Sequence, residues 1–363
     1  MADPLRFGFI GAGEIAVQTA RAVAEAEHAR LVAVTDADPE LAGDLARSSG
    51  SEAMDSPDEL LARDDVDAVY IAVPHFLHGM LAQAAARAGK HVLLEKPAGT
   101  TADEGERIVR TARDCGVTLS VPFVLRYAAP WATARDLVAD GALGELQGVR
   151  ITHTVRKPDA YWHGGYSGRS RSDWRTRQLQ AGGGVLIMNA IHEIDAVRWA
   201  TGLEAERVSA EAGTFATEAE VEDLIGAVVR YRGGAVGLIA AASHAPGGPG
   251  PAGDGGHRIL GTLGQAVIAG GHLWFYSEQE GPAAPAGRWV DLPAPQERDP
   301  RVALVEDYAR ALAAGEPPPI PDDAGLEALK VVSAAYQSRQ SGRAVRIEEL
   351  FQRPVMAPRS TVG

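Results

Sequence analysis

The chain has 363 residues, of which 45% are hydrophobic and 23% charged, and its formal net charge is -13. This composition is that of an ordinary folded protein and argues against a disordered or fibrous chain. The length exceeds what a single core usually holds, so two domains are expected. The negative charge argues against general binding to nucleic acid or to anionic membrane surfaces.

The sequence also bears on the compartment. Cys115 is the single cysteine, so an intrachain disulfide is excluded and a cytoplasmic location is expected. The first residues lack the basic stretch and long apolar region of a secretory signal. No uninterrupted apolar run reaches the ~18 residues of a transmembrane helix, so no membrane span is expected.

The first third of the chain alternates strand-like and helix-like segments. Strands are predicted at residues 5–10, 31–35, 68–73, 91–95 and 117–121, with a weaker extended piece at 51–54. Helices are predicted at residues 14–26, 39–48, 78–88 and 101–115. Thr101, with Glu104 three residues later, is a capping-box start for the last of these helices. Short connections in this alternation predict a doubly wound parallel α/β sheet, which we assign to a first domain of residues 1–124.

After residue 124 the pattern changes. Adjacent strands joined by tight turns predict antiparallel pairing, most clearly for residues 224–231 and 235–243 around a glycine-containing turn. We therefore expect a second α+β domain, residues 125–363, with a largely antiparallel sheet. Its other predicted features are a helix at 131–140, a strand at 146–154, a polar and arginine-rich stretch at 156–180, a glycine-led helix, a mobile loop at 244–256, and two C-terminal helices separated at 317–319.

A glycine-rich turn directly follows the first predicted strand. It fits the G-x-G-x-x-G/A pattern of dinucleotide-binding domains, with Ala16 at the last position. In this pattern the first glycine permits a tight turn, the second lets the backbone approach a pyrophosphate, and the following helix N-terminus offers amide donors. The candidate cofactor-binding residues here are Gly11, Ala12, Gly13, Glu14 and Ile15.

Asp36 stands at the end of the second predicted strand. A carboxylate at this place can accept hydrogen bonds from the adenosine ribose and would repel a 2′-phosphate, so NAD is favoured over NADP. The same carboxylate can instead cap its own turn, residues 36–39, and the two roles are compatible.

Further motifs resemble the Gfo/Idh/MocA family, the glucose–fructose oxidoreductase and inositol dehydrogenase group. One is Val73-Pro74-His75-Phe76-Leu77-His78 with Glu95-Lys96-Pro97 after the next strand, and another is Gly182-Gly183-Gly184 followed by His192 and Asp195. Supporting likenesses are Arg126-Tyr127 before Pro130, Asp173-Trp174-Arg175, and Tyr336-x-Ser338. The resemblance extends from residue 5 to about residue 347.

The resemblance implies an NAD-dependent oxidoreductase. It would transfer a hydride between nicotinamide and a secondary hydroxyl or ketone of a sugar, aminosugar, cyclitol or sugar nucleotide, and would form a homodimer or homotetramer. Two alternatives stay open: NAD-dependent glycoside cleavage by transient oxidation, and a catalytically silent sensor of NAD or sugar. The additional cofactor-binding residues implied are Val73, Pro74, His75, His78, Glu95 and Lys96.

Hydride transfer at a carbinol carbon needs a base for the proton and a cation near the developing alkoxide. Lys96 follows a parallel strand, where open α/β sheets bind ligands, and His192 titrates near neutral pH. We expect these two to be catalytic, although a lone lysine is usually a solvated surface group and a lone histidine usually structural. The predicted substrate-binding residues are Lys96, Arg126, Trp174, Arg175, Asn189 and His192.

The sequence departs from the family pattern at one position. Many members carry an acid four residues before the histidine, but this position is Met188. Asn189 is rotated by about 100° from it on an α-helix and cannot act as a base. Either Asn189 or Asp195 could orient the ring of His192, and Lys96 could share the proton handling. His75 and His78 have a spacing compatible with metal ligation, but without further clustered ligands no metal is expected.

Overall fold

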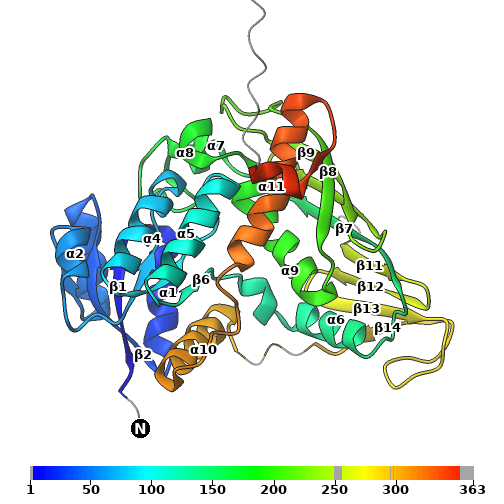
Figure 1. Cartoon of the computed structure of the whole chain (residues 1–363), viewed down its shortest axis with the longest axis horizontal. Helices are drawn as coiled ribbons and strands as arrows, with labels where there is room; N and C mark the ends of the chain where they lie inside the picture. Colours follow the sequence, from blue (N-terminus) through cyan, green and yellow to red (C-terminus); the bar gives the residue numbers. More distant parts are fainter. Residues whose placement is uncertain (1–2, 249–255, 295, 297, 352–363) are drawn as a thin grey trace, which may run out of the picture.

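The computed structural model describes residues 3–248, 256–294, 296 and 298–351. The chain forms two domains that lie side by side, the first coloured blue to cyan and the second mainly green to yellow (Figure 1). Most of the loop predicted at 244–256 lies outside the described residues. Within the described part, no helix is both long and apolar enough to cross a membrane.

The first domain contains a six-stranded sheet in the order β3-β2-β1-β4-β5-β6, with all neighbouring strands parallel. Its strands are β1 (Leu5–Ile10), β2 (Ala29–Thr35), β3 (Glu52–Ala53), β4 (Ala68–Ile71), β5 (His91–Leu94) and β6 (Leu119–Ser120). Its helices are α1 (Glu14–Glu25), α2 (Pro39–Ser49), α3 (Pro57–Leu61), α4 (His78–Arg87) and α5 (Ala102–Asp114). The predicted doubly wound sheet is confirmed. The strand order reverses between β1 and β4, which opens a crevice at their carboxyl ends.

The N-cap residue of α5 is as predicted, but one hydrogen bond of the capping box differs. Thr101 Oγ1 accepts from the Glu104 amide, as a capping box requires. The Glu104 carboxylate, however, accepts from the amide and hydroxyl of Thr100 rather than from the amide of Thr101. The turn before the helix is therefore tied down one residue earlier than the pattern predicts.

The second domain contains a nine-stranded sheet in the order β14-β13-β12-β11-β7-β10-β9-β8-β15. Its strands are β7 (Leu146–Thr154), β8 (Ala205–Gly213), β9 (Leu224–Tyr231), β10 (Val236–Ala242), β11 (His257–Gly261), β12 (Gly264–Ala269), β13 (His272–Ser277), β14 (Arg288–Leu292) and β15 (Val345–Arg346). Adjacent strands pair antiparallel except β7 and β10, which are parallel because the chain returns through β8 and β9 before it reaches β10. The predicted hairpin is β9–β10.

The remaining helices are α6 (Ala129–Ala139), α7 (Asp159–Gly164), α8 (Gln178–Ala181), α9 (Ile191–Thr201), α10 (Pro300–Ala314) and α11 (Ala324–Ser341). Of these, α6, α9 and α11 pack against the nine-stranded sheet. Short helical turns are η1 (His75–Leu77), η2 (Val124–Tyr127), η3 (Trp174–Thr176), η4 (Leu186–Ala190) and η5 (Ile347–Phe351). Helix α10 packs against α1 and α11 against both α5 and β8, so the C-terminal helices contact both domains (Figure 1).

Candidate active site

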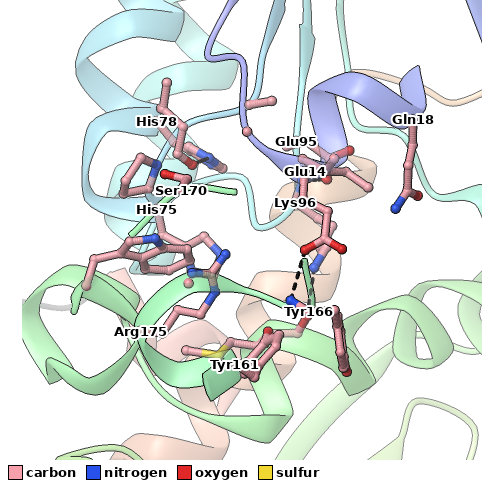
Figure 2. Close-up of a pocket in the computed structure, with 18 of the residues that line it drawn as sticks. Glu14, Gln18, His75, His78, Glu95, Lys96, Tyr161, Tyr166, Ser170 and Arg175 are labelled. Atoms are coloured by element: carbon pink, nitrogen blue, oxygen red, sulfur yellow. Dashed lines mark hydrogen bonds between the residues drawn. The ribbon is translucent and has the colours of Figure 1, made fainter. Parts of the chain in front are cut away.

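A cavity of about 1120 Å³, part of it open to solvent, lies between the two domains. The first domain contributes Gly13, Glu14, Ile15, Gln18, Ala72, Val73, Pro74, His75, His78, Glu95 and Lys96 to its wall. The second domain contributes Tyr161, Gly164, Tyr166, Ser170, Trp174, Arg175, Met188 and Asn189. Figure 2 shows the segments that carry Tyr161 and Arg175 facing those that carry His75, His78 and Lys96. The cavity therefore opens at the carboxyl ends of β1, β4 and β5, where the strand order reverses.

Most predicted site residues meet at this cavity. Twelve of them line its wall: Gly13, Glu14, Ile15, Val73, Pro74, His75, His78, Glu95, Lys96, Trp174, Arg175 and Asn189. The predicted residues that do not line it are Gly11, Ala12, Asp36, Arg126 and His192. The sequence did not single out Gln18, Ala72, Gly164 or Ser170, and it marked Met188 only as a departure from the family pattern. Tyr161 and Tyr166 of the arginine-rich stretch also line the wall. The aromatic and arginine content of residues 156–180 was the available signal for the tyrosines.

The glycine-rich turn fits a dinucleotide phosphate. Gly11 has φ +102°, and a Cβ there would lie 2.3 Å from the Ala72 carbonyl oxygen, so this position requires glycine. A Cβ at Gly13 would meet no protein atom within 4 Å. Gly13 is the N-cap of α1, so no side chain of the N-cap residue satisfies the first amides of this helix. The turn therefore leaves open space beside the exposed amides of a twelve-residue helix, which suits a pyrophosphate.

Asp36 holds this turn in place. Its Oδ2 accepts from the Ala12 amide at 2.6 Å, and its Oδ1 accepts from the Asp38 amide at 2.9 Å. The carboxylate thus caps its own turn, as one of the two sequence interpretations expects, and it also fixes the glycine-rich turn. It is partly exposed.

A segment of the second domain crosses the glycine-rich turn. The Arg169 guanidinium donates to the carbonyl oxygens of Ala12, at 2.9 Å, and Leu41, at 3.2 Å. The Tyr166 amide donates to Glu14 Oε2 at 3.0 Å, a contact drawn as a dashed line in Figure 2. These contacts join segments more than 120 residues apart, and no local sequence pattern predicts them.

Two buried histidines follow β4. His75 Nδ1 lies 2.8 Å from the Ala181 carbonyl oxygen of the second domain, and the ring packs against Trp174 with centroids 4.5 Å apart. The ring nitrogens of His78 lie 2.8 and 3.0 Å from the carbonyl oxygens of Pro97 and Val73. Burial lowers the pKa of both imidazoles. His75 can donate from Nδ1 to the Ala181 carbonyl, whereas a neutral His78 carries one N–H and can donate to one of its two carbonyl oxygens at a time.

Glu95 and Lys96 end β5 with different surroundings. Glu95 is buried and accepts a 2.7 Å hydrogen bond from the Tyr70 hydroxyl, with Arg301 3.5 Å away. The Lys96 ammonium donates at 2.7 Å to the Met188 carbonyl oxygen across the cavity. Burial lowers the pKa of Lys96, and the neighbouring Glu95 carboxylate raises it. Lys96 is therefore a cation held at the junction of the two domains, with its charge only partly compensated.

The glycine triplet makes a close backbone contact. A Cβ at Gly184 would lie 1.8 Å from the Glu222 carbonyl oxygen, and a Cβ at Gly183 would lie 2.1 Å from the Tyr336 hydroxyl. The Glu222 carboxylate accepts from the amides of Gly184 and Leu186 and from the Tyr336 hydroxyl. The triplet thus anchors the start of the helix that carries Met188, Asn189 and His192 toward the cavity.

The helix that follows is not a regular α-helix. Residues Leu186–Ala190 form a π-helical turn before α9 begins at Ile191. The wider turn changes the rotation between successive side chains, so the 100° spacing assumed from the sequence does not hold here. Both Met188 and Asn189 line the cavity as a result, and Asn189 Oδ1 is buried without a hydrogen-bond partner.

His192 is partly exposed but is not among the residues that line the cavity. Its Nδ1 is buried without a hydrogen-bond partner, and its ring meets Phe123 edge-on at 5.9 Å. Burial and the charge of Lys96 lower the pKa of His192 to about 4, so the ring is neutral at physiological pH. His192 Nδ1 has no partner and Asp195 pairs with Arg126, so neither Asn189 nor Asp195 orients the ring through this nitrogen.

Arg126 and Asp195 bind each other instead. Two hydrogen bonds of 2.8 and 2.6 Å join the guanidinium and the carboxylate, and both side chains are buried. The pair links η2 to α9. A buried charge that lost its partner would destabilise the fold by roughly 3–5 kcal/mol, so Arg126 serves to hold the helix that carries His192.

Among the described residues, the group of His and carboxylate side chains with the geometry for a metal ion is Glu27, His28 and Glu306. His28 Nδ1 already pairs with Glu306, and none of the three lines the cavity described above.

A doubly wound parallel sheet with a glycine-rich turn, closed by a second domain over the carboxyl ends of its strands, defines a two-domain dinucleotide-binding protein. Residues 5–123 match the family described as "Oxidoreductase family, NAD-binding Rossmann fold", and residues 131–267 match the "GFO/IDH/MocA C-terminal domain". The chain belongs to the Gfo/Idh/MocA family of oxidoreductases.

Individual relatives agree with this assignment. The 1,5-anhydro-D-fructose reductase of Ensifer adhaerens is 32% identical over 235 residues, 64% of this chain and 67% of that protein. Alignments with four further relatives span 44 to 60% of their length. The myo-inositol 2-dehydrogenase of Thermotoga maritima aligns over 100% of its length at 24% identity. The structure of the Caulobacter crescentus aldose-aldose oxidoreductase in complex with glycerol superposes with a TM-score of 0.81 at 27% identity, covering 94% of this chain and 99% of that one. A levoglucosan dehydrogenase complex with NADH and levoglucosan gives a TM-score of 0.82 at 25% identity, covering 95% and 100%.

Dinucleotide binding can be tested at Gly13, which has open space beside it. We expect Gly13→Ala to lower the stability of the ligand-free protein by no more than about 1 kcal/mol, because the methyl group meets no protein atom and only an N-cap is altered. NAD affinity should fall at least ~10-fold, because the methyl group occupies the space assigned to the pyrophosphate. Calorimetric titration measures this affinity. Gly281→Ala, which also faces open space but lies away from the cavity, is the matched control, and an unchanged NAD affinity in Gly13→Ala would contradict the assignment.

Proposed function

We propose that this protein is an NAD-dependent dehydrogenase or reductase. It transfers a hydride between the nicotinamide and a secondary hydroxyl or ketone of a sugar, aminosugar, cyclitol or sugar nucleotide. The observation that carries the proposal is the position of Lys96, whose ammonium reaches from the end of β5 across the interdomain cavity to the Met188 carbonyl oxygen. The substrates named for the reductase and dehydrogenase relatives support the same class.

The first domain is the proposed cofactor site. The glycine-rich turn and the start of α1 would hold the pyrophosphate, Asp36 the adenosine ribose, and the segment around Val73, Pro74, His75 and His78 the nicotinamide half. When bound, the nicotinamide supplies the carbon that accepts or donates the hydride. Glu95 would fix the end of β5 through its hydrogen bond with Tyr70.

Lys96 and His192 are the proposed catalytic residues. The Lys96 ammonium would exchange its bond with the Met188 carbonyl for one with the reacting oxygen, and would stabilise negative charge that develops there. His192 is neutral and has a free ring nitrogen, so it can accept the hydroxyl proton. Because His192 is not among the residues that line the cavity, we propose that the proton reaches it along Lys96 or a water molecule.

Trp174, Arg175 and Asn189 are the proposed substrate contacts. All three line the cavity, and the Arg175 Nη1 and Asn189 Oδ1 atoms are buried without a partner. A buried donor or acceptor without a partner is destabilising, so these atoms are suited to bind polar groups of a ligand. The sequence-based assignment of Arg126 to the substrate is not kept, because both of its hydrogen bonds go to Asp195.

The catalytic assignment predicts the kinetics of two variants. We expect Lys96→Ala and His192→Ala each to lower turnover at least ~100-fold with NAD affinity largely kept, because each removes a group that acts on the reacting oxygen or its proton. Absorbance of the reduced nicotinamide during a screen of polyols and sugars measures turnover. Lys330→Met, which removes a lysine paired with Glu327 away from the cavity, is the control. Near-normal turnover in either variant would contradict its role, and firm NAD binding without turnover on any candidate would favour a sensor.

Asp36 generates a separate prediction about cofactor choice. Asp36→Ala should weaken NAD and raise the relative affinity for NADP, because the carboxylate that would repel a 2′-phosphate is removed. The ratio of the two dissociation constants measures the effect. Since Asp36 also fixes the Ala12 amide, Asp36→Asn, which keeps one acceptor oxygen, separates loss of charge from loss of that hydrogen bond. An unchanged ratio in both variants would remove the proposed ribose contact.

We propose a homodimer or homotetramer, built on the outer face of the nine-stranded sheet. Strand register places the paired residues Val228 and Leu238, and likewise the β13 residue Trp274, on the face opposite the helices. The large exposed apolar side chains of these strands are Leu224, Val228, Leu238, Leu260, Trp274 and Trp289. Such a patch is typical of a protein interface. The free, exposed Cys115 is in keeping with the cytoplasm as the proposed location.

Light scattering after size-exclusion chromatography tests this interface. We expect Leu238→Arg to yield monomers, because two such charges would be buried against each other in a symmetric contact. Leu179→Arg, at an exposed leucine on α8, should leave the assembly unchanged. A wild-type monomer at micromolar concentration, or an unaltered oligomer in Leu238→Arg, would show that this face is not the interface.

A further inference from the structure

Lys157 is a buried lysine beside the cavity that the proposed chemistry does not use. It lies shortly after the end of β7 at Thr154, its backbone amide donates to the Ser243 carbonyl oxygen, and the residue is 2% exposed. Its Nζ lies 3.9 Å from Met188 Sδ and 4.2 and 5.3 Å from the ring centroids of Tyr161 and Trp162. Within the described part of the chain, it forms no ion pair with a carboxylate. The rings stabilise an ammonium but bring no negative charge to balance it.

Two further basic side chains, Arg175 and Lys96, lie on the same wall of the cavity. The Arg175 guanidinium lies over the rings of Tyr161 and Trp174, and its Nη1 is buried without a hydrogen-bond partner. Lys96 contacts the Met188 carbonyl oxygen. Burial lowers the pKa of Lys157 well below its usual value, and the charges of Lys96 and Arg175 lower it further. Lys96 and Lys157 both contact Met188, and Lys157 and Arg175 both lie over the Tyr161 ring, so the three basic groups are close enough to repel one another.

The acidic groups nearby are already engaged. Glu95 accepts from Tyr70, and Glu14 accepts from the Tyr166 amide. Glu222, whose charge raises the pKa of Lys157, accepts two amide hydrogen bonds and one from a tyrosine. Met188, the side chain nearest Lys157, carries no charge. This wall of the cavity therefore holds three basic side chains, Lys96, Lys157 and Arg175, none of which forms an ion pair with a carboxylate in the described part of the chain.

We propose that the substrate carries a carboxylate, which Arg175 binds directly and whose charge Lys157 balances from behind Met188 and Tyr161. The inference rests on the proposed function, since it names the substrate class of that site: a sugar or cyclitol acid. A guanidinium with a free nitrogen on a cavity wall suits the planar oxygens of a carboxylate. A single negative charge placed here would also offset the repulsion among the three basic groups.

Matched acidic and neutral sugars test the proposal. With NAD bound to the intact protein, we expect D-glucuronate and D-galacturonate to bind at least ~10-fold more tightly than D-glucose and D-galactose. Calorimetric titration measures binding whether or not a hydride is transferred. Equal affinities, absence of uronate binding, or a preference for glucose 6-phosphate over the uronates would overturn the proposal.

Lys157→Met tests the contribution of this lysine. Methionine has a similar length and no charge, so the preference for uronates should fall to within ~3-fold, while affinity for the neutral sugars stays unchanged. Lys330→Met should keep the full preference. Without ligand, Lys157→Met should unfold at the same or a higher temperature than the wild type, because an uncompensated buried ammonium is removed. An unaltered preference in a folded Lys157→Met variant would overturn the role of Lys157.

The outcomes also separate this inference from the proposed function. Tight uronate binding without hydride transfer to or from any bound sugar would overturn the dehydrogenase and leave the carboxylate site standing. Hydride transfer with neutral sugars, without a preference for uronates, would support the dehydrogenase and overturn the carboxylate site.

Discussion

The hydrogen bond from the Lys96 ammonium to the Met188 carbonyl oxygen is the contact on which the site depends. It joins the end of a strand in the first domain to a helical turn of the second, 92 residues later in the chain. A second hydrogen bond, from His75 to the Ala181 carbonyl oxygen, also joins the first domain to the second. Together these bonds hold a basic side chain at the carboxyl end of a parallel sheet, against a wall that the sheet itself does not provide. Displacing that helical turn would leave Lys96 without its partner in the second domain.

Backbone packing controls where the turn lies. Two glycines of the triplet place their Cα atoms where any side chain would collide with Glu222 or Tyr336, and the Glu222 carboxylate satisfies the amides that begin the helix. A π-helical turn then brings Met188 and Asn189 to the cavity together. The buried pair of Arg126 and Asp195 secures α9 from the other side. Structural residues far from the ligand thus set the position of the chemical ones.

Burial sets the electrostatics of the site. Removal from water lowers the pKa of Lys96, Lys157 and His192, and the positive charges reinforce that shift in one another. The Glu95 and Glu222 carboxylates oppose the shift at Lys96 and Lys157 but do not outweigh it. A cavity of this kind favours a ligand that brings electron-rich oxygens, and most of all one that brings a negative charge. Aromatic rings pack against the Lys157 ammonium and the Arg175 guanidinium. Because they lower the local dielectric constant, each remaining polar contact is electrostatically stronger.

The sequence by itself determined the parallel first domain, because strand and helix periodicity and the glycine-rich turn are local properties of the chain. It also determined that Lys96 ends a strand at the ligand-binding edge and that the glycine triplet starts a helix, since each motif occupies consecutive residues. Tertiary structure alone decided the rest. Arg169 crosses over Ala12, and Arg126 pairs with Asp195, so both contacts join residues distant in the chain. Lys157 is buried by residues that are likewise distant from it, such as Met188. The π-helical turn overrode the regular helical spacing, and no periodicity in the sequence predicts it. Contacts of this kind follow from how two domains pack, and a linear pattern does not contain that information.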